Sequence, residues 1–218
     1  MEEQESRNVK SKARYIFAFI IGTALFALGF MIVYSISYFE YQRVSNLQDN
    51  LAYIIFEDKI GYSFFNEGIC ANVSLKKISD DLGFQGVIIN DLENKFGKND
   101  ERVLDRKKFY SLVLLEHFEF VKLLNEKCNS NISTILFFYS NIPDESTKSE
   151  DVGRLLDVIG SKNPGKIMIY SFDVNLNSEL IKKIKEKYNI TDSPIIVINE
   201  KNKITNPQST MEIEKLLK

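Results

Sequence analysis

The stretch Tyr188–Ile204 (YNITDSPIIVINEKNKI) joins a helix end, a proline, an apolar run and a turn within one short segment. Pro194 opens the run Pro194–Ile198, whose consecutive apolar side chains are typical of a strand buried on both faces. Proline is tolerated at the first residue of a strand, where an X-Pro bond can also be cis at modest cost. A Glu-Lys-Asn turn and a short strand near Lys203–Thr205 follow, so the stretch predicts the last hairpin of a sheet.

Further elements of the same sheet are predicted upstream. Thr134–Tyr139 (TILFFY) and Lys166–Ser171 (KIMIYS) are continuous apolar runs of the kind that form buried strands, and a helical pattern around Asp151–Ile159 lies between them. Two more helical patterns occupy Ser178–Tyr188 and Met211–Leu217. The predicted element order is therefore βαβαββα, an α/β fold.

Composition marks where this domain begins, because all four prolines follow position 140 and the strand-like runs begin at Thr134. We place a C-terminal domain at residues 131–218. Its element order and the stretch Tyr188–Ile204 resemble the thioredoxin fold, in which a helix end, a cis-proline and the last hairpin follow one another. The resemblance implies that Pro194 is the cis-proline and that Ser193 and Pro194 line a substrate groove. The layout of the whole chain resembles membrane-anchored thioredoxin-like proteins of archaea.

The active-site motif of that family is missing. Redox-active members carry a Cys-x-x-Cys pair that follows the first strand and opens the next helix, where the helix N-terminus stabilises a thiolate. Here residues 144–153 read DESTKSEDVG, and counting back from Leu155-Leu156-Asp157 puts Ser146 and Ser149 at the two cysteine positions. A hydroxyl cannot exchange with a disulfide, because the nucleophile in that reaction is sulfur. The resemblance thus implies a degenerate site that lacks the family's dithiol chemistry, which argues against an enzyme.

Without the family, the two serines are typical of a capped helix start with acidic residues near its positive end. Catalysis by Ser146 or Ser149 is disfavoured, since the sequence places no histidine or lysine base to activate either hydroxyl.

An uncharged segment near the N-terminus predicts a membrane anchor. No residue between Arg14 and Glu40 carries a charge, and Tyr15–Ser37 is apolar enough to cross ~30 Å of hydrocarbon as a helix. Four basic residues precede this segment, whereas Arg43 is the only basic residue in the first turns after it. The positive-inside bias then places residues 1–14 in the cytoplasm and everything after the span outside the cytoplasm.

A cleaved secretory signal is the alternative interpretation of this segment. Ser35-Ile36-Ser37 resembles a small-x-small cleavage site. The apolar segment is, however, longer than the ~7–15 residues usual for the core of a signal peptide, which favours a span that is retained.

The middle of the chain, residues 38–130, is predicted to be helical. From Glu40 to Asn129 it contains no proline, and its apolar residues recur at helical spacing. A first helix continues out of the span and ends near Gly68, with a coiled-coil-like seam of Val44, Leu47, Leu51 and Ile54. A second helix follows the plausible cap Ser74 and ends near Gly97, and a third runs over Glu101–Cys128. Short connections predict that these last two helices form an antiparallel hairpin.

The two cysteines of the chain flank this hairpin. Cys70 precedes the second helix and Cys128 closes the third, so an antiparallel arrangement would bring them together at one end. A location outside the cytoplasm would permit a disulfide between them. Two unrelated buried thiols are the alternative, since that is the usual environment of free cysteine.

Charge and histidine content argue against several classes of site. The 28 Lys and Arg residues nearly balance 30 Asp and Glu residues, so no broad positive field for nucleic acid is expected. His117 is the only histidine, and it has no partner at metal-ligand spacing, so it is expected to pack in the core. We expect neither a metal nor a cofactor.

Three functional hypotheses follow. The leading one is a redox-inactive, membrane-anchored protein outside the cytoplasm that binds a polypeptide or another envelope protein beside Pro194. The second is a thiol–disulfide oxidoreductase that works through Cys70 and Cys128. The third is a structural protein whose helical region pairs between two chains as a coiled-coil homodimer.

Overall fold

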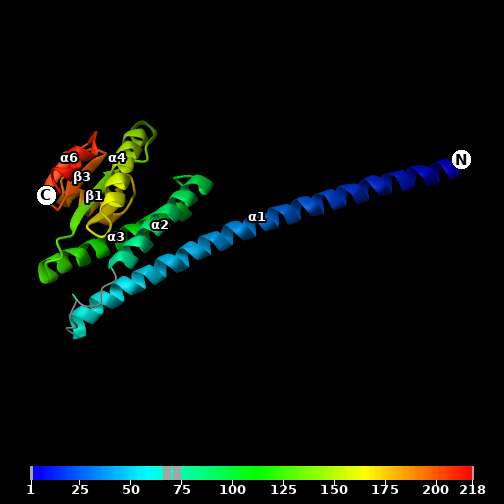
Figure 1. Cartoon of the computed structure of the whole chain (residues 1–218). Helices are drawn as coiled ribbons and strands as arrows, with labels where there is room; N and C mark the ends of the chain where they lie inside the picture. The colour runs from blue at the N-terminus through cyan, green and yellow to red at the C-terminus, as the bar shows by residue number, and fades with distance from the viewer. Residues whose placement is uncertain (1, 66–69, 71–74, 218) are drawn as a thin grey trace. The chain divides into compact units, whose positions relative to one another are not determined.

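The computed structural model describes the backbone at residues 2–65, 70 and 75–217, and the chain is drawn in Figure 1. The chain divides into two compact units, Met1–Val44 and Ser45–Lys218. Most of the described elements are helices, accompanied by one mixed sheet of four strands. The described part of the first unit is helix alone, and the second unit contains the whole sheet.

Helix α1 (Glu2–Phe65) is 64 residues long and begins in the first unit. Many of its large apolar side chains between Tyr15 and Phe39 are exposed, with Tyr15 at 75% and Phe26 at 76% of full accessibility. Such a surface is favourable in hydrocarbon and unfavourable in water. Helix α1 is therefore long and apolar enough near the N-terminus to cross a membrane, and the predicted span 15–37 lies within it.

Helices α2 (Leu75–Phe96) and α3 (Glu101–Cys128) pack together as the predicted pair (Figure 1). Gly97 follows α2 with φ of 93°, a left-handed conformation that glycine adopts without strain. Asp100 caps α3 by accepting a hydrogen bond from the Arg102 N–H at 3.0 Å. The expected cap at Ser74 and helix end near Gly68 lie outside the described residues.

The remaining elements have the predicted βαβαββα order, and their bounds are β1 (Ser133–Tyr139), α4 (Pro143–Lys162), β2 (Ile167–Asp173), α5 (Glu179–Lys187), β3 (Ile195–Ile198), β4 (Asn202–Thr205) and α6 (Thr210–Glu214). The strands lie in the order β2-β1-β3-β4. Strand β1 is parallel to β2 and antiparallel to β3, and β3 is antiparallel to β4. The peptide bond between Ser193 and Pro194, just before β3, is cis.

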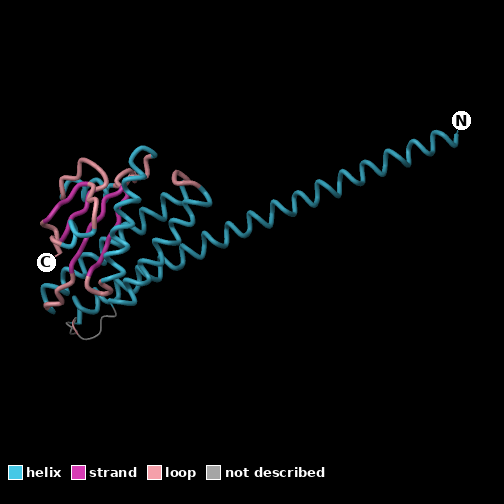
Figure 2. The backbone as a smooth tube through the Cα atoms, turned by 45° about the horizontal axis from the view of Figure 1, so that its top comes forward, coloured by secondary structure: helices cyan, strands magenta, loops and turns pink. Residues whose placement is uncertain are grey.

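Helices cover both faces of the sheet, as Figure 2 shows. Alternate side chains of a strand point to opposite faces, so a buried strand contributes to two cores. On one face, Leu136 and Phe138 of β1 share a core with residues of β2, α3 and α5, namely Tyr170, Phe172, Phe118, Val121, Ile181 and Ile184. On the other face, Ile135 and Phe137 pack with residues of α4 and α6, namely Val152, Leu156, Ile159 and Ile213. Strand β1 is therefore buried on both sides, as its unbroken apolar run predicts.

Helix α3 belongs to the core of the sheet and to the core of the helical region at once. Leu51 and Ile55 of α1 and Ile78 and Leu82 of α2 belong to the same continuous core as Phe138. Residues 45–130 and 131–218 consequently form one compact unit, and the composition change near residue 130 does not coincide with a break in packing.

Helix α4 begins at Pro143, three residues before Ser146, the first of the two serines expected at the helix start, and it contains the helical pattern around Asp151–Ile159. Proline is favourable at the first position of a helix because the N–H it lacks would have no partner there. Asp144 and Glu145 lie in the first turn, where their charges are favourable beside the positive end of the helix dipole. Ser146 and Ser149 therefore lie inside the helix and do not cap it.

His117 of α3 is fully buried against Tyr170 of β2, as expected of a packing residue. Its Nδ1 atom is 2.9 Å from the Tyr170 hydroxyl, whereas its Nε2 atom is buried and has no hydrogen-bond partner among the residues that the structure describes. Burial lowers the pKa of His117 from 6.5 to about 4, because the charged imidazolium would lose its hydration. The native state therefore holds a neutral imidazole at neutral pH.

This environment predicts acid sensitivity. In the unfolded chain His117 takes up a proton near pH 6.5, whereas the folded chain resists protonation until about pH 4, so stability falls as the pH drops through that interval. The loss should reach about 3 kcal/mol. The measurement is chemical unfolding of the full chain in detergent micelles at a series of pH values. His117→Gln should lack this component between pH 7 and 5, and an unchanged slope in that variant would contradict the assignment.

Candidate functional site

The opening of α4 lies beside the start of β3. The Ser193 hydroxyl donates a hydrogen bond to Glu145 Oε2 at 2.9 Å, which joins the residue before Pro194 to the first turn of α4. The neighbouring hydroxyls of Ser140 and Ser193 lower the pKa of Glu145, so this carboxylate is ionised at neutral pH. Ser193 is half-buried and Pro194 is buried. Ile142, at the N-cap position, is 47% exposed.

Ser146 and Ser149, the two serines predicted at the family's cysteine positions, form hydrogen bonds with backbone groups and not with each other. The Ser146 hydroxyl donates to the Pro143 carbonyl at 3.2 Å. Ser149 is buried, and its hydroxyl oxygen accepts a hydrogen bond from the Ser140 N–H at 3.0 Å. The structure thus places Ser193 next to Glu145, while Ser149 fixes the end of β1 against α4.

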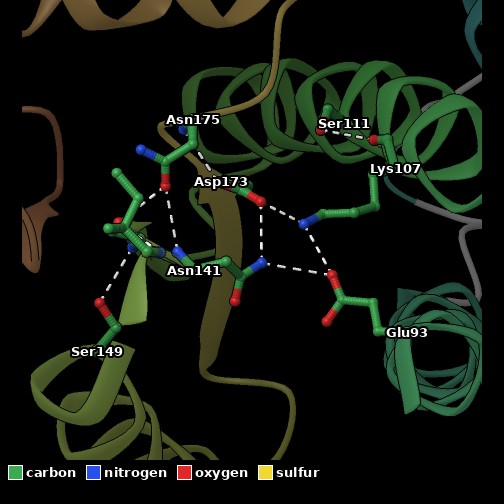
Figure 3. Close-up of polar contacts among 9 residues, drawn as sticks. Glu93, Lys107, Ser111, Asn141, Ser149, Asp173 and Asn175 are labelled. Carbon is green, nitrogen blue, oxygen red and sulfur yellow. Dashed lines mark hydrogen bonds and ion pairs between the residues drawn. The ribbon is translucent and has the colours of Figure 1, made fainter. Parts of the chain in front are cut away.

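Figure 3 shows a polar network that the sequence did not reveal, at the ends of β1 and β2. Asn175 Oδ1 accepts hydrogen bonds from the Ser140 hydroxyl at 2.8 Å and from the Asn141 N–H at 3.1 Å. The Asn175 N–H donates to Asp173 Oδ1 at 2.9 Å. These bonds fix the loop that leads from β1 into α4.

The centre of this network is the ammonium group of Lys107, which is only 5% exposed. It forms ion pairs with Glu93 Oε1 at 2.8 Å and with Asp173 Oδ2, whose side chains are 9% and 6% exposed. The amide of Asn141 donates to Asp173 Oδ2 at 3.0 Å and to Glu93 Oε1 at 3.4 Å. One buried cation therefore faces two buried carboxylates, and Asn141 adds hydrogen bonds to both.

A weak sequence signal for this cluster existed at Lys107. It lies on the buried side of α3 together with Val103, Ser111 and Leu114, so a lysine occurs where the helical pattern demands an apolar residue. Lysine is almost never fully buried without a partner. The pattern could have suggested a buried ion pair, although nothing in it names the partners.

The pKa of Tyr139 is affected by the two carboxylates of this cluster. Burial, together with the carboxylates of Asp173 and Glu93, raises the pKa of Tyr139 well above its usual value. The Lys107 ammonium lies 5.6 Å from the centre of the Tyr139 ring, within the range of a cation–π contact.

A pocket of about 570 Å³ adjoins the cluster. It is bounded by α2, α3 and α4 and by side chains of β1 and β2, which forms an edge of the sheet. Its lining includes the buried ion-pair cluster and, on α4, both Ser146 and Ser149. None of Ile142, Glu145, Ser193 and Pro194 lines it, although the pocket reaches the opening of α4 at Asn141 and Ser146.

The predicted disulfide between Cys70 and Cys128 is present. It closes a sequence separation of 58 residues and joins a point before α2 to the last residue of α3. Cys70 is exposed and Cys128 is half-buried. Because the chain has only these two cysteines, no thiol is present near the opening of α4.

Comparison with known proteins finds no relative, since no protein-family model and no curated protein matches this chain. Within the described residues, no group of three or more His, Cys, Asp or Glu side chains is arranged to hold a metal ion.

The cluster predicts a large effect of Lys107→Met on stability. Removing the ammonium leaves Glu93 and Asp173 buried side by side without a cation, which should lower the free energy of unfolding by about 3–5 kcal/mol. Lys108→Met is the matched control, because Lys108 pairs with Asp105 at an exposed position where loss should stay within about 0.5 kcal/mol. Chemical unfolding of both full-length variants in micelles measures the difference. Equal stabilities would refute the role of the cluster.

Proposed function

We propose that the chain is a membrane-anchored, redox-inactive protein with a thioredoxin-like domain that binds a polypeptide. The binding surface comprises Ile142, Glu145 and Ser193, which lie beside the buried Pro194, and we name it the α4-opening surface. The domain lies outside the cytoplasm in this proposal, as the basic residues before the span and the disulfide between Cys70 and Cys128 both favour.

The topology of the sheet supports the thioredoxin-like assignment. The element order βαβαββα, with a parallel β1–β2 pair and an antiparallel β3–β4 hairpin, agrees with the resemblance derived from Tyr188–Ile204. Ser193-Pro194 has the cis bond that the resemblance implies. Fold by itself is a weak guide to function, so the proposal depends on the residues at the opening of α4.

The chemistry at the opening of α4 supports binding without thiol exchange. The family's cysteine pair opens the helix after the first strand, and here that helix opens with Ile142-Pro143-Asp144-Glu145. Neither these residues nor Ser146 and Ser149 contain sulfur, so both ways of aligning the motif leave no thiol. A bound polypeptide could still contact this surface, because the exposed Ile142 lies about one helical turn from the Glu145–Ser193 hydrogen bond.

The exposed side chain of Ile142 beside the Glu145–Ser193 hydrogen bond is the observation that carries this proposal, since it offers an apolar contact next to polar groups, and an interface combines both kinds of surface. Ile142→Asp should weaken binding of an unfolded probe, reduced and alkylated lysozyme, by about tenfold or more, since the apolar contact is replaced by a charge. The full chain in phosphatidylcholine nanodiscs is titrated with labelled probe and followed by fluorescence anisotropy.

Val158→Asp is the matched control, because Val158 lies on the same helix and is 45% exposed. It should leave probe binding unchanged. Equal binding by the two variants, or no binding by the unmodified chain, would remove the α4-opening surface from consideration.

The exposure of Cys70 favours one alternative, a thiol–disulfide oxidoreductase. In that reaction a substrate dithiol would give two electrons and two protons to the Cys70–Cys128 bond, forming a substrate disulfide and two protein thiols; the reverse reaction would reduce a substrate. Under our proposal the bond is structural and resists exchange.

An insulin-reduction assay with dithiothreitol separates the two functions. We expect the full chain in nanodiscs and its Cys70→Ser/Cys128→Ser variant to leave the uncatalysed rate unchanged. Turnover by the unmodified chain that disappears in the double variant would instead assign the oxidoreductase function to this disulfide.

A further inference from the structure

One face of α4 turns two carboxylates toward the pocket beside the Lys107 cluster. Glu150 and Asp157 line this pocket together with Ser149 and Gly153, and the four positions follow helical spacing. The side chains of Glu150 and Asp157 make no hydrogen bond or ion pair to any residue that the structure describes. They are therefore available to a ligand.

Asp157 is partly removed from water even though it lies at an exposed position. The surrounding protein raises the pKa of its carboxyl group by desolvation, and no described cation compensates. A bound positive charge would supply that compensation.

The lining of the pocket carries an excess of negative charge. Its ionisable side chains comprise the four carboxylates of Glu93, Glu150, Asp157 and Asp173 and the two ammonium groups of Lys98 and Lys107. The difference is a formal charge of −2. Lys107 is already engaged by the two buried carboxylates, so only the exposed Lys98 remains opposite Glu150 and Asp157.

The other walls of the pocket suit an alkyl chain. Phe137 and Tyr139 lie with ring centres 5.7 Å apart, and Tyr110 and Ile169 add further apolar surface. Gly83 leaves one wall open, because no atom lies within 4 Å of the place where a Cβ would be. Aromatic rings combined with carboxylates are a favourable environment for an organic cation.

We propose that this pocket binds a primary alkylammonium group, with the charge at Glu150 or at Asp157, which lie about two helical turns apart, and the alkyl chain along Phe137 and Tyr139. Lys107 provides the precedent within the same pocket, since its own alkylammonium group lies between two carboxylates and near the Tyr139 ring. The pocket volume of about 570 Å³ accommodates a linear diamine or a lysine side chain with its flanking peptide groups. This site is independent of the α4-opening surface.

The test uses the full chain in nanodiscs of phosphatidylcholine, which carries no net charge and so does not concentrate amines. Cadaverine and Nα-acetyl-lysine methylamide are titrated separately by isothermal calorimetry, with 1-pentanol as the neutral control. At least one amine should bind saturably with a dissociation constant of about 1 mM or lower, and 1-pentanol should not bind. Stronger binding of cadaverine assigns the site to free amines, and stronger binding of the lysine derivative assigns it to a polypeptide side chain.

The variant Glu150→Gln/Asp157→Asn should weaken amine binding by about tenfold or more. Its matched control is Asp151→Asn/Glu179→Gln, which neutralises two exposed carboxylates outside the pocket and should leave binding unchanged. Gly83→Leu provides a second, uncharged test, because its side chain would fill the open wall and abolish binding. Absence of saturable binding by both amines, or equal weakening by the pocket variant and its control, would overturn the proposal.

Discussion

The buried ammonium group of Lys107 is the contact on which the arrangement of the second unit depends. It brings together Glu93 of α2, Lys107 of α3 and Asp173 at the end of β2, and Asn141 adds the loop before α4. A charge removed from water is tolerated only when it is paired and hydrogen-bonded, so each member of the cluster requires the others. The helical hairpin, which packs on one face of the sheet, is thereby linked to the end of β2, and the same carboxylates fix the loop that precedes α4.

The fold was predictable wherever apolar residues recur with a clear period. The runs at Thr134–Tyr139 and Pro194–Ile198 predicted buried strands, and the sheet buries both. The start of α4 was expected a few residues too late, at Ser146 and Ser149, because its apolar pattern begins only near Val152, whereas its first turns are set by Pro143 and by acidic residues. Patterns of hydrophobicity do not contain that information.

The polar cluster was not predictable for a different reason. Glu93 and Lys107 lie on the two helices of the predicted hairpin, but Asp173 is 66 residues from Lys107 and Asn141 is 48 residues from Glu93. No local spacing connects them, and only the folded topology brings the end of β2 to α3. The disulfide shows the contrast: Cys70 and Cys128 are as distant in sequence, but the hairpin between them could be derived from helix length and short connections, so their meeting could be expected.

The positive end of α4 is already occupied by the chain's own charges, and this limits what the opening of the helix can recognise. A helix N-terminus attracts anions through its unpaired N–H groups and its dipole, and in redox-active thioredoxin-fold proteins that field stabilises a thiolate. Here Asp144 and Glu145 supply the negative charge, and Glu145 also accepts a hydrogen bond from Ser193. A further anion would be repelled by these carboxylates. Recognition at this end of the sheet should therefore favour neutral or positively charged groups, for the same electrostatic reason that the neighbouring pocket is suited to an ammonium ion.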